Sequence, residues 1–286
     1  MLWVLRALWV AVGLAGSSAL GGALADASGP VQAVAFVGGW AGWAAVLLGL
    51  AAPRSVGLTA VRLGAPAAVV AFGVGAARGP AGVDDALALT LAVVAAGLAL
   101  SAPIADALVD GSSYGDERRF ALRTPPALLP AALVAWLLTV VVPAAGLLLL
   151  AARSWLLGGL LVVVGVAGMY LGVPALHRLA RRWLVFVPAG VVVHDHLVLA
   201  EPVLLRRTSV QSLGPAEPGP AIDLTSGAGG LAVALLLSAP IELALVQSKG
   251  RDRQAAPALT DRLLVAPVRP GAVVATARER RVGSAA

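Results

Sequence analysis

Two patterns of apolar residues divide this chain. Up to residue 176, long apolar stretches are separated by short polar connections. Beyond residue 187, short apolar runs alternate with turns rich in Gly and Pro, which is typical of strands. The stretch between them, residues 176–187, reads Leu-His-Arg-Leu-Ala-Arg-Arg-Trp-Leu-Val-Phe-Val. The sequence therefore predicts two parts, residues 1–176 and residues 177–286.

The first part is predicted to be a bundle of six transmembrane helices. A helix needs about 20 mainly apolar residues to cross about 30 Å of hydrocarbon, and isolated strands cannot satisfy their backbone groups in lipid. Six segments meet this criterion: 5–25, 31–52, 56–77, 83–105, 127–151 and 155–176. Glycines that permit close helix packing in a bilayer recur in the last two segments, at Gly146, Gly158, Gly165 and Gly168.

The first segment also resembles a secretory signal peptide. Arg6 precedes an apolar core, and Ala23-Leu24-Ala25 matches the Ala-x-Ala pattern of a cleavage site. The apolar stretch is longer than the usual signal core, and further apolar segments follow closely. We therefore favour a retained helix, and cleavage stays open as the alternative.

The arginines predict the orientation. The N-terminus and the even-numbered connections carry most of them: Arg6, Arg54, Arg118, Arg119, Arg123, Arg178, Arg181 and Arg182. The odd-numbered connections hold only Arg78 and Arg153, together with three aspartates. Because basic residues stay on the cytoplasmic side, both termini and the second part are expected in the cytoplasm.

The second part is predicted to be a small, mainly β domain with a C-terminal helix. Its apolar runs cover residues 183–187, 191–194, 197–199, 203–213, 221–225, 231–237, 241–247 and 261–266. A polar loop is expected around residues 249–253, and an amphipathic helix over residues 270–282. Residues 229–246 are nearly long enough to span a membrane, but Pro240 and Glu242 interrupt them, so a hairpin of two strands is predicted there.

This order of elements carries a resemblance to a known family. About seven strands and a final helix, with Arg-Trp-Leu-Val-Phe-Val-Pro-Ala-Gly-Val-Val-Val directly after a membrane helix, resemble a bacterial pleckstrin-homology-like (PH-like) domain over residues 182–282. The resemblance implies a bent antiparallel sheet capped by a helix and used for binding or assembly. Residues 1–176 resemble uncharacterised bacterial polytopic membrane proteins in general.

Composition supports a membrane protein. Hydrophobic residues make up 59% of the 286 and charged residues 13%, with a mean hydropathy of +0.90, whereas soluble domains carry about a quarter charged residues. Arginine outnumbers lysine, of which there is one, and asparagine is absent, which indicates the codon bias of a GC-rich bacterial genome. The net charge of +6 is therefore weak evidence for nucleic acid, and we expect no nucleic-acid partner.

No catalytic or metal-binding pattern is found. The chain has no cysteine, and it lacks the phosphate-binding loop, the nucleophile elbow and the His-Glu-x-x-His helix. His194 and His196 share one face of a predicted strand, but two imidazoles are too few ligands for a site. We therefore predict no metal, no cofactor and no enzymatic activity.

Two groups of residues are the candidate binding sites. Arg178, Arg181, Arg182 and Trp183 are expected at the membrane surface, where basic residues attract anionic lipid head groups. The second group lies in the connection between the fourth and fifth helices and consists of Asp116, Glu117, Arg118 and Arg119. These residues either dock a partner or ligand or belong to a solvated connector. We favour the solvated connector. Arg6 and Arg62 lie in or near apolar segments, where a functional role at membrane depth is the alternative, and we favour long side chains that reach the interface.

These features predict a multi-pass protein of the bacterial plasma membrane. Its partners would be the bilayer, anionic lipid head groups or another membrane protein, and its role would be assembly, scaffolding or regulation. The alternative is a small transporter or channel for an uncharged or hydrophobic substrate, because few ionisable residues lie at membrane depth. The sequence leaves the oligomeric state open.

Overall fold

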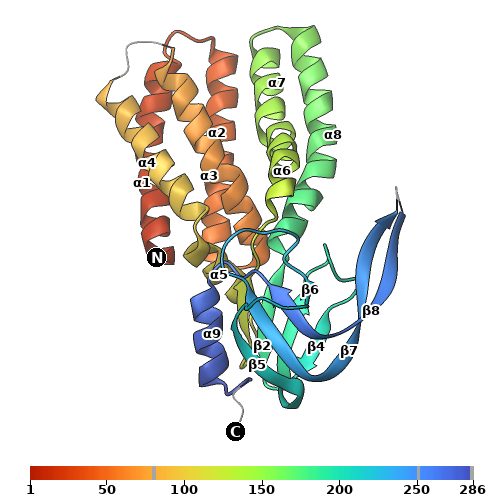
Figure 1. The fold of residues 1–286 in the computed structure, drawn as a ribbon. Helices are drawn as coiled ribbons and strands as arrows, with labels where there is room; N and C mark the ends of the chain where they lie inside the picture. Colours follow the sequence, from red (N-terminus) through yellow and green to blue (C-terminus); the bar gives the residue numbers. More distant parts are fainter. Residues whose placement is uncertain (79–81, 250–251, 284–286) are drawn as a thin grey trace. The chain divides into compact units, whose positions relative to one another are not determined.

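The computed structural model describes residues 1–78, 82–249 and 252–283. The chain folds into two compact units (Figure 1). A helical unit contains Met1–Leu108 and Pro130–Arg178, and a sheet unit contains Val109–Leu129 and Leu179–Ala286. The sheet unit therefore takes in residues 109–129, which the sequence pattern placed within the membrane part.

Four long helices begin the helical unit: α1 (Leu2–Ala23), α2 (Gly29–Ala51), α3 (Ser55–Ala76) and α4 (Val83–Ala99). Helix α1 packs against α2 and α4, and α3 packs against the same two helices. Two tryptophans join α1 to α2 reciprocally, because Trp9 Nε1 donates to the Trp43 carbonyl at 2.9 Å and Trp43 Nε1 donates to the Trp9 carbonyl at 2.8 Å. Each buried indole N–H thus has its acceptor in the neighbouring helix.

The fourth predicted helix is bent. Helix α4 ends at Ala99, and α5 (Ala102–Asp110) continues at an angle of 62°. Pro103 lies in the first turn of α5, where proline is tolerated because its missing N–H would have no partner in the helix.

The remaining helices form a tight hairpin. It consists of a 3₁₀ turn η1 (Pro126–Leu128), α6 (Leu129–Trp136), a π-helical turn η2 (Leu137–Val141), α7 (Val142–Ala151) and α8 (Trp155–Ala180). Glycines face the opposite helix: a Cβ on Gly158 would meet Leu150 N at 2.7 Å, and one on Gly168 would meet the Leu138 carbonyl oxygen at 2.6 Å. The predicted close packing through glycine is confirmed here.

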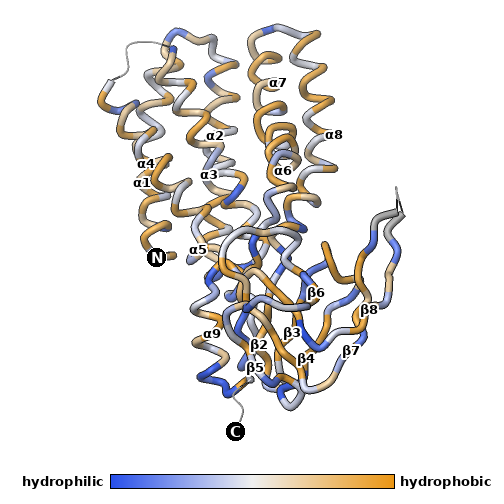
Figure 2. The backbone as a smooth tube through the Cα atoms, in the orientation of Figure 1, coloured by the Kyte–Doolittle hydropathy of each residue, from blue (hydrophilic) through white to orange (hydrophobic). Residues whose placement is uncertain are grey.

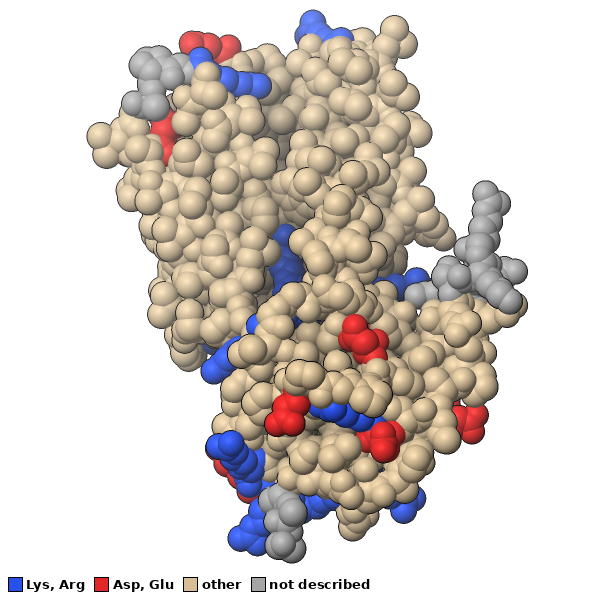
Figure 3. Space-filling model, viewed as in Figure 1, with Lys and Arg blue, Asp and Glu red and all other residues tan. Residues whose placement is uncertain are grey.

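The helical unit has the exterior of a membrane protein. Five helices are long and apolar enough to cross a bilayer, and the bent pair α4 and α5 makes a sixth if it counts as one span. Large apolar side chains point outward, for example Leu156 at 92% exposure and Tyr170 at 80%. The apolar colouring follows these helices in Figure 2, and most of their sides are free of charge in Figure 3.

The sheet unit is built from two four-stranded sheets and one helix. The first sheet is antiparallel, in the order β1 (Arg118–Ala121), β2 (Trp183–Val187), β3 (Gly190–His194) and β4 (Val203–Arg206). A 3₁₀ turn η3 (Arg207–Ser209) leads into the second sheet, in the order β5 (Val210–Pro215), β7 (Val233–Lys249), β8 (Asp252–Val265) and β6 (Ile222–Asp223). Helix α9 (Pro270–Glu279) follows and packs against β5.

Alternation along the strands creates the core of this unit. Leu184 and Phe186 of β2 share one face, and Phe120 of β1 lies on the same face because successive side chains alternate. Phe120 and Phe186 meet edge to face with ring centroids 5.9 Å apart. From the second sheet and α9, apolar side chains such as Leu235 and Val273 complete the same cluster.

Several predicted strands are confirmed, and one hairpin is wrong. The strands at 183–187 and 191–194 are present, whereas the run at 203–213 is divided by η3 into β4 and β5, which belong to different sheets. The two runs at 231–237 and 241–247, however, belong to the single strand β7, whose pairing with β8 is irregular between Leu236 and Ile241. Pro240 lies in this irregular stretch, where a missing N–H interrupts the ladder without ending the strand.

Smaller differences concern the strand ends. Residues 197–199 form a turn with one bridge, Leu199 to Leu245, in place of a strand. Of the loop expected at 249–253, residues 250–251 lie outside the described part, and β8 begins at Asp252. The final helix ends at Glu279, three residues earlier than predicted.

Candidate functional site

The connection between α5 and α6 is a structural part of the sheet unit. Its strand β1 pairs with β2, from Arg118 opposite Phe186 to Ala121 opposite Trp183. Past the strand, Leu122 N donates to the Arg182 carbonyl at 3.0 Å and Arg123 N donates to the Ala266 carbonyl at 2.8 Å. The connector interpretation is therefore wrong for β1, because this segment supplies an edge strand and its backbone bonds.

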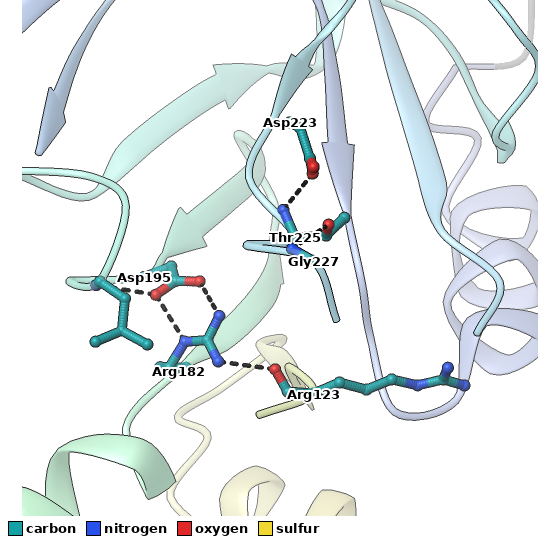
Figure 4. A network of polar contacts seen from close by, with 7 residues as sticks. Arg123, Arg182, Asp195, Asp223, Thr225 and Gly227 are labelled. Atoms are coloured by element: carbon teal, nitrogen blue, oxygen red, sulfur yellow. Dashed lines mark hydrogen bonds and ion pairs between the residues drawn. The ribbon is translucent and has the colours of Figure 1, made fainter. Parts of the chain in front are cut away.

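A buried ion pair lies where α8 leads into β2. Arg182 Nε donates to Asp195 Oδ1 at 2.7 Å, and its Nη2 donates to Oδ2 at 2.6 Å (Figure 4). The two side chains are 1% and 0% exposed. The remaining Nη1 donates to the Arg123 carbonyl at 2.7 Å, and Leu197 N donates to Asp195 Oδ1 at 3.1 Å. These extra bonds offset the cost of desolvating two charges.

Arg182 is accordingly not available to lipid. A guanidinium that is buried and bidentate with a carboxylate has no surface left for a head group. Arg178 and Arg181 are exposed, and Trp183 is half-buried. The predicted basic cluster thus separates into two exposed arginines and one internal arginine.

Arg123 connects three segments of the sheet unit. Its N–H bonds to Ala266, its carbonyl accepts from Arg182, and its guanidinium donates to the Gly229 carbonyl. The loop around Gly229 has its own internal bonds, from Thr225 N to Asp223 Oδ1 at 2.7 Å and from Gly227 N to Thr225 Oγ1 at 3.3 Å (Figure 4). A residue expected only as a topology signal is therefore a packing centre of this unit.

A row of polar and aromatic side chains crosses the opposite face of the first sheet. The Trp183 indole stacks on the His194 imidazole with centroids 4.9 Å apart and planes inclined by 13°. The Arg119 guanidinium lies 5.6 Å from the Trp183 ring and pairs with Glu117 at 2.8 Å. Both interactions are favourable, because cations and stacked rings match the charge distribution of an indole.

The electrostatics of this row favour a neutral histidine and an ionised glutamate. Burial lowers the pKa of His194, and the positive charges of Arg181 and Arg119 lower it further against the opposing effect of Asp195. The hydrogen bond from Arg119 lowers the pKa of Glu117. At neutral pH this face therefore presents a fixed cation, an aromatic ring and an uncharged imidazole.

The other loop residues are held close to β1. Asp110 forms an ion pair with Arg118, accepts from Arg119 N at 2.8 Å and accepts from Ser113 Oγ at 3.0 Å. Asp116 is exposed. Asp110 thus joins the end of α5 to the start of β1.

The histidines do not assemble a metal site in the described residues. No group of three or more His, Asp or Glu side chains able to hold a metal ion occurs among residues 1–78, 82–249 and 252–283. His194 is engaged with Trp183, and His177 lies in the helical unit.

Two arginines of the helical unit differ from each other. Arg6 Nε and Nη2 donate to the Leu50 carbonyl at 2.9 and 2.7 Å, and its guanidinium lies 4.5 Å from the Trp3 ring. Arg6 therefore satisfies the last turn of α2, in addition to any contact with the interface. Arg62, by contrast, makes no ion pair or hydrogen bond with any residue that the structure describes.

The buried pair could have been found from the sequence. A two-residue turn at 188–189 pairs Trp183 with His194, and continuing that register by one position sets Arg182 opposite Asp195. Opposite charges at directly opposed positions of a hairpin are a recognisable pairing signal. No such local signal exists for Arg123, whose partners lie 59 and 106 positions away in the sequence.

Comparisons with known proteins yield no match: no protein-family model, no curated protein and no solved structure is significantly similar to this chain.

Proposed function

We propose that this chain is a bacterial plasma-membrane protein whose sheet unit is a non-catalytic module for assembly or regulation at the cytoplasmic surface. The module would act through contacts with anionic lipid or with another membrane protein. The helical spans support the membrane location, and the excess of arginine in the N-terminal segment and even connections supports the orientation.

One observation carries the proposal: the sheet unit is built from two separate stretches of the chain. The chain passes between the units three times, after Leu108, after Leu129 and after Arg178. A domain that is merely tethered needs one connection. Three connections suit a module that is conformationally coupled to the helices. A change in the module would then alter the helices, and a change in the helices would alter the module.

The order of elements in the sheet unit supports the PH-like proposal. The mainly antiparallel pairing and the C-terminal helix support it, whereas the division into two sheets and the parallel pair of β6 and β8 differ from the single bent sheet that the resemblance implies. The first strand is supplied from between α5 and α6, which departs from a domain contained wholly in residues 182–282. A fragment that begins at residue 177 would lack β1. Binding by this domain should therefore be tested on the whole chain.

The lipid contact is proposed for Arg178 and Arg181. Both are exposed beside the junction of α8 and β2, and each basic residue near an anionic surface contributes about 1 kcal/mol of attraction. The full-length chain, reconstituted in nanodiscs of phosphatidylcholine and phosphatidylglycerol, should enrich phosphatidylglycerol among its retained lipids. The double variant Arg178→Gln/Arg181→Gln should lose most of that enrichment.

The matched control is Arg78→Gln/Arg153→Gln, which removes the same charge from the predicted outer side. Equal phosphatidylglycerol enrichment in the two double variants contradicts the proposed lipid contact. The orientation is checked in a separate experiment. Since the chain has no cysteine, a single introduced thiol can be labelled without background. A single Glu201→Cys substitution in the sheet unit should react with a membrane-impermeant maleimide only after the cells are opened.

A further inference from the structure

Arg62 is a cation with no partner among the described residues, inside a helix that is long and apolar enough to span a membrane. It lies seven residues after the start of α3 (Ser55–Ala76), about 10 Å along the axis at 1.5 Å per residue. Its side chain is half-buried, and no described residue accepts a hydrogen bond from it or pairs with it. Ionisable groups at this depth are rare and normally paired.

The face of α3 that carries Arg62 meets two other helices. Thr59, one turn earlier on that face, is buried, and its hydroxyl lies 2.8 Å from Nδ1 of His177 in α8. Trp136 Nε1 of α6 donates to the Leu63 carbonyl at 3.0 Å. Polar groups from α3, α6 and α8 therefore gather within one turn of Arg62.

The helix itself adds an acceptor at the same position. Pro66 lies inside α3, and proline has no N–H to donate to the carbonyl four residues earlier. That carbonyl belongs to Arg62. A carbonyl oxygen accepts hydrogen bonds and cannot bind an oxyanion, so the guanidinium is the group of Arg62 that can hold an anion.

No described carboxylate pairs with Arg62, although α4, which packs against α3, carries Asp84 and Asp85 in its first turn. Residues 29–76 and 126–180 contain no Asp and no Glu, so α2, α3, α6, α7 and α8 have no carboxylate to offer. Arg6 shows that an arginine in these helices can be satisfied by a backbone carbonyl. Arg62 has no such partner in the part of the chain that the structure describes, although an ionisable group within a membrane span is normally paired.

We propose that Arg62 is the principal residue of an oxyanion site in the helical unit, with Thr59 and His177 as its polar neighbours. The ligand class is phosphate, because the five N–H donors of a guanidinium match two oxygens of one phosphate group. The phosphate belongs either to a lipid head group or to a free anion, and both present the same oxygens to Arg62.

Two binding measurements on the full-length chain separate these sources. The chain is purified in a neutral detergent with its lipids removed, and radiolabelled inorganic phosphate is titrated by equilibrium dialysis. A second titration uses phosphatidylglycerol against phosphatidylcholine in mixed micelles. Saturable phosphate binding identifies a free anion, whereas binding of phosphatidylglycerol alone identifies a lipid head group.

Arg62→Gln should weaken whichever ligand binds by about tenfold or more, since it removes a charge-assisted hydrogen bond. The control Arg54→Gln removes an arginine from the residue that precedes α3 and should bind like the native chain. Saturable binding of neither ligand, or equal affinity in Arg62→Gln and the native chain, overturns the proposal.

A variant that keeps the charge guards against misfolding. If Arg62→Gln gives no folded protein, Arg62→Lys replaces it. Lysine retains the positive charge but not the planar pair of donors, so its affinity should fall by a smaller factor. Unchanged affinity in Arg62→Lys, together with a misfolded Arg62→Gln, overturns the proposed two-oxygen contact.

Discussion

The two units bury arginine in opposite ways. In the sheet unit, Arg182 is enclosed with Asp195 and donates from all three of its guanidinium nitrogens. In the helical unit, Arg62 is half-buried and pairs with no carboxylate of the residues that the structure describes. The first arrangement is complete within the chain, and the second calls for a ligand. The comparison shows that the surroundings of a buried charge, more than its depth, indicate whether it has a structural or a binding role.

The units also differ in what holds them together. The sheet unit encloses apolar side chains such as Leu184, Phe186 and Leu235 at 0% exposure, so removal of apolar surface from water drives its folding. The helical unit exposes many of its large apolar side chains, although some such as Trp9 and Leu50 are buried, and helices in lipid associate mainly by close packing. Glycine therefore contributes to tight packing in the helical unit, whereas buried leucine and phenylalanine stabilise the sheet unit.

The largest effect is expected from breaking the buried ion pair. Arg182→Met leaves the Asp195 carboxylate buried without its cation and should lower the free energy of unfolding of the sheet unit by about 3–5 kcal/mol. The measurement uses the reactivity of a single thiol introduced as Val193→Cys, which is buried in the native chain and reacts only after local unfolding.

Two controls accompany this substitution. Arg182→Met/Asp195→Leu removes both charges and should restore much of the lost stability. Glu117→Gln breaks a partly exposed pair and should cost less than about 1 kcal/mol. If Arg182→Met is no more reactive than Glu117→Gln, the buried pair does not stabilise this unit.

A comparably large effect is expected at Phe120, which tests whether the connection between α5 and α6 belongs to the sheet unit. Phe120 is 1% exposed, so Phe120→Ala should destabilise that unit by about 3–5 kcal/mol, measured with the same thiol. Tyr114→Ala changes an aromatic residue of the same loop that is 88% exposed and should be nearly neutral. Equal effects of the two substitutions contradict the assignment of this segment to the sheet unit.

An intermediate effect is expected at two adjacent glycines of α8. Gly158→Ala forces a Cβ against Leu150 N at 2.7 Å, whereas a Cβ on Gly159 meets nothing within 4 Å. Gly158→Ala should therefore destabilise the helical unit by about 1–3 kcal/mol, and Gly159→Ala should be neutral or slightly stabilising because alanine favours helix. Thermal unfolding of the detergent-solubilised chain measures both, and the opposite order argues against glycine-mediated packing.

The smallest effect concerns pH and the face that carries His194. Its pKa in the folded chain is lowered, so the unfolded chain binds the extra proton first as the pH falls below about 6.5. The contribution of neutral His194 to the free energy of unfolding should be fully present above the ordinary histidine pKa. It should be lost as the pH falls through the pKa of His194 in the folded chain. His194→Gln should remove that part of the pH dependence.

Charge removal gives the matching test of cause. Arg181→Gln deletes a repulsive neighbour and should raise the pKa of His194, followed by NMR of histidine-labelled protein. The control Arg278→Gln removes an exposed arginine of α9 and should leave that pKa unchanged. A His194 pKa that is equal in both variants excludes a contribution from the charge of Arg181.

Much of the fold follows from local patterns in the sequence. The apolar stretches predicted the candidate spans, and two short apolar runs at 183–187 and 191–194 on either side of Pro188-Ala-Gly190 predicted the first hairpin, since both signals depend on neighbouring residues. The strand β1 could not be predicted, because a four-residue segment becomes a strand only through pairing with β2, more than 60 positions later in the chain. Local pattern also misjudged Pro240, because the long ladder between β7 and β8 continues past it.

The candidate sites divide in the same way. Exposure of Arg178 and Arg181 was expected from their place after an apolar helix. The burial of Arg182 depends on an acidic partner across a hairpin, and the isolation of Arg62 depends on which helices lie beside α3. Tertiary neighbours decide these roles, and composition alone does not report them.

The position of β1 in the chain also delays its pairing during synthesis. Ala121 leaves the ribosome 62 residues before its partner Trp183, which corresponds to about 3–12 s at 5–20 residues per second. During that interval α6, α7 and α8, which include two candidate membrane spans, are synthesised while β1 and its Phe120 have no strand to pair with. A nascent chain stalled before residue 183 would therefore display an unpaired, aromatic strand to the chaperones of the cell, and release of the stall would hide it.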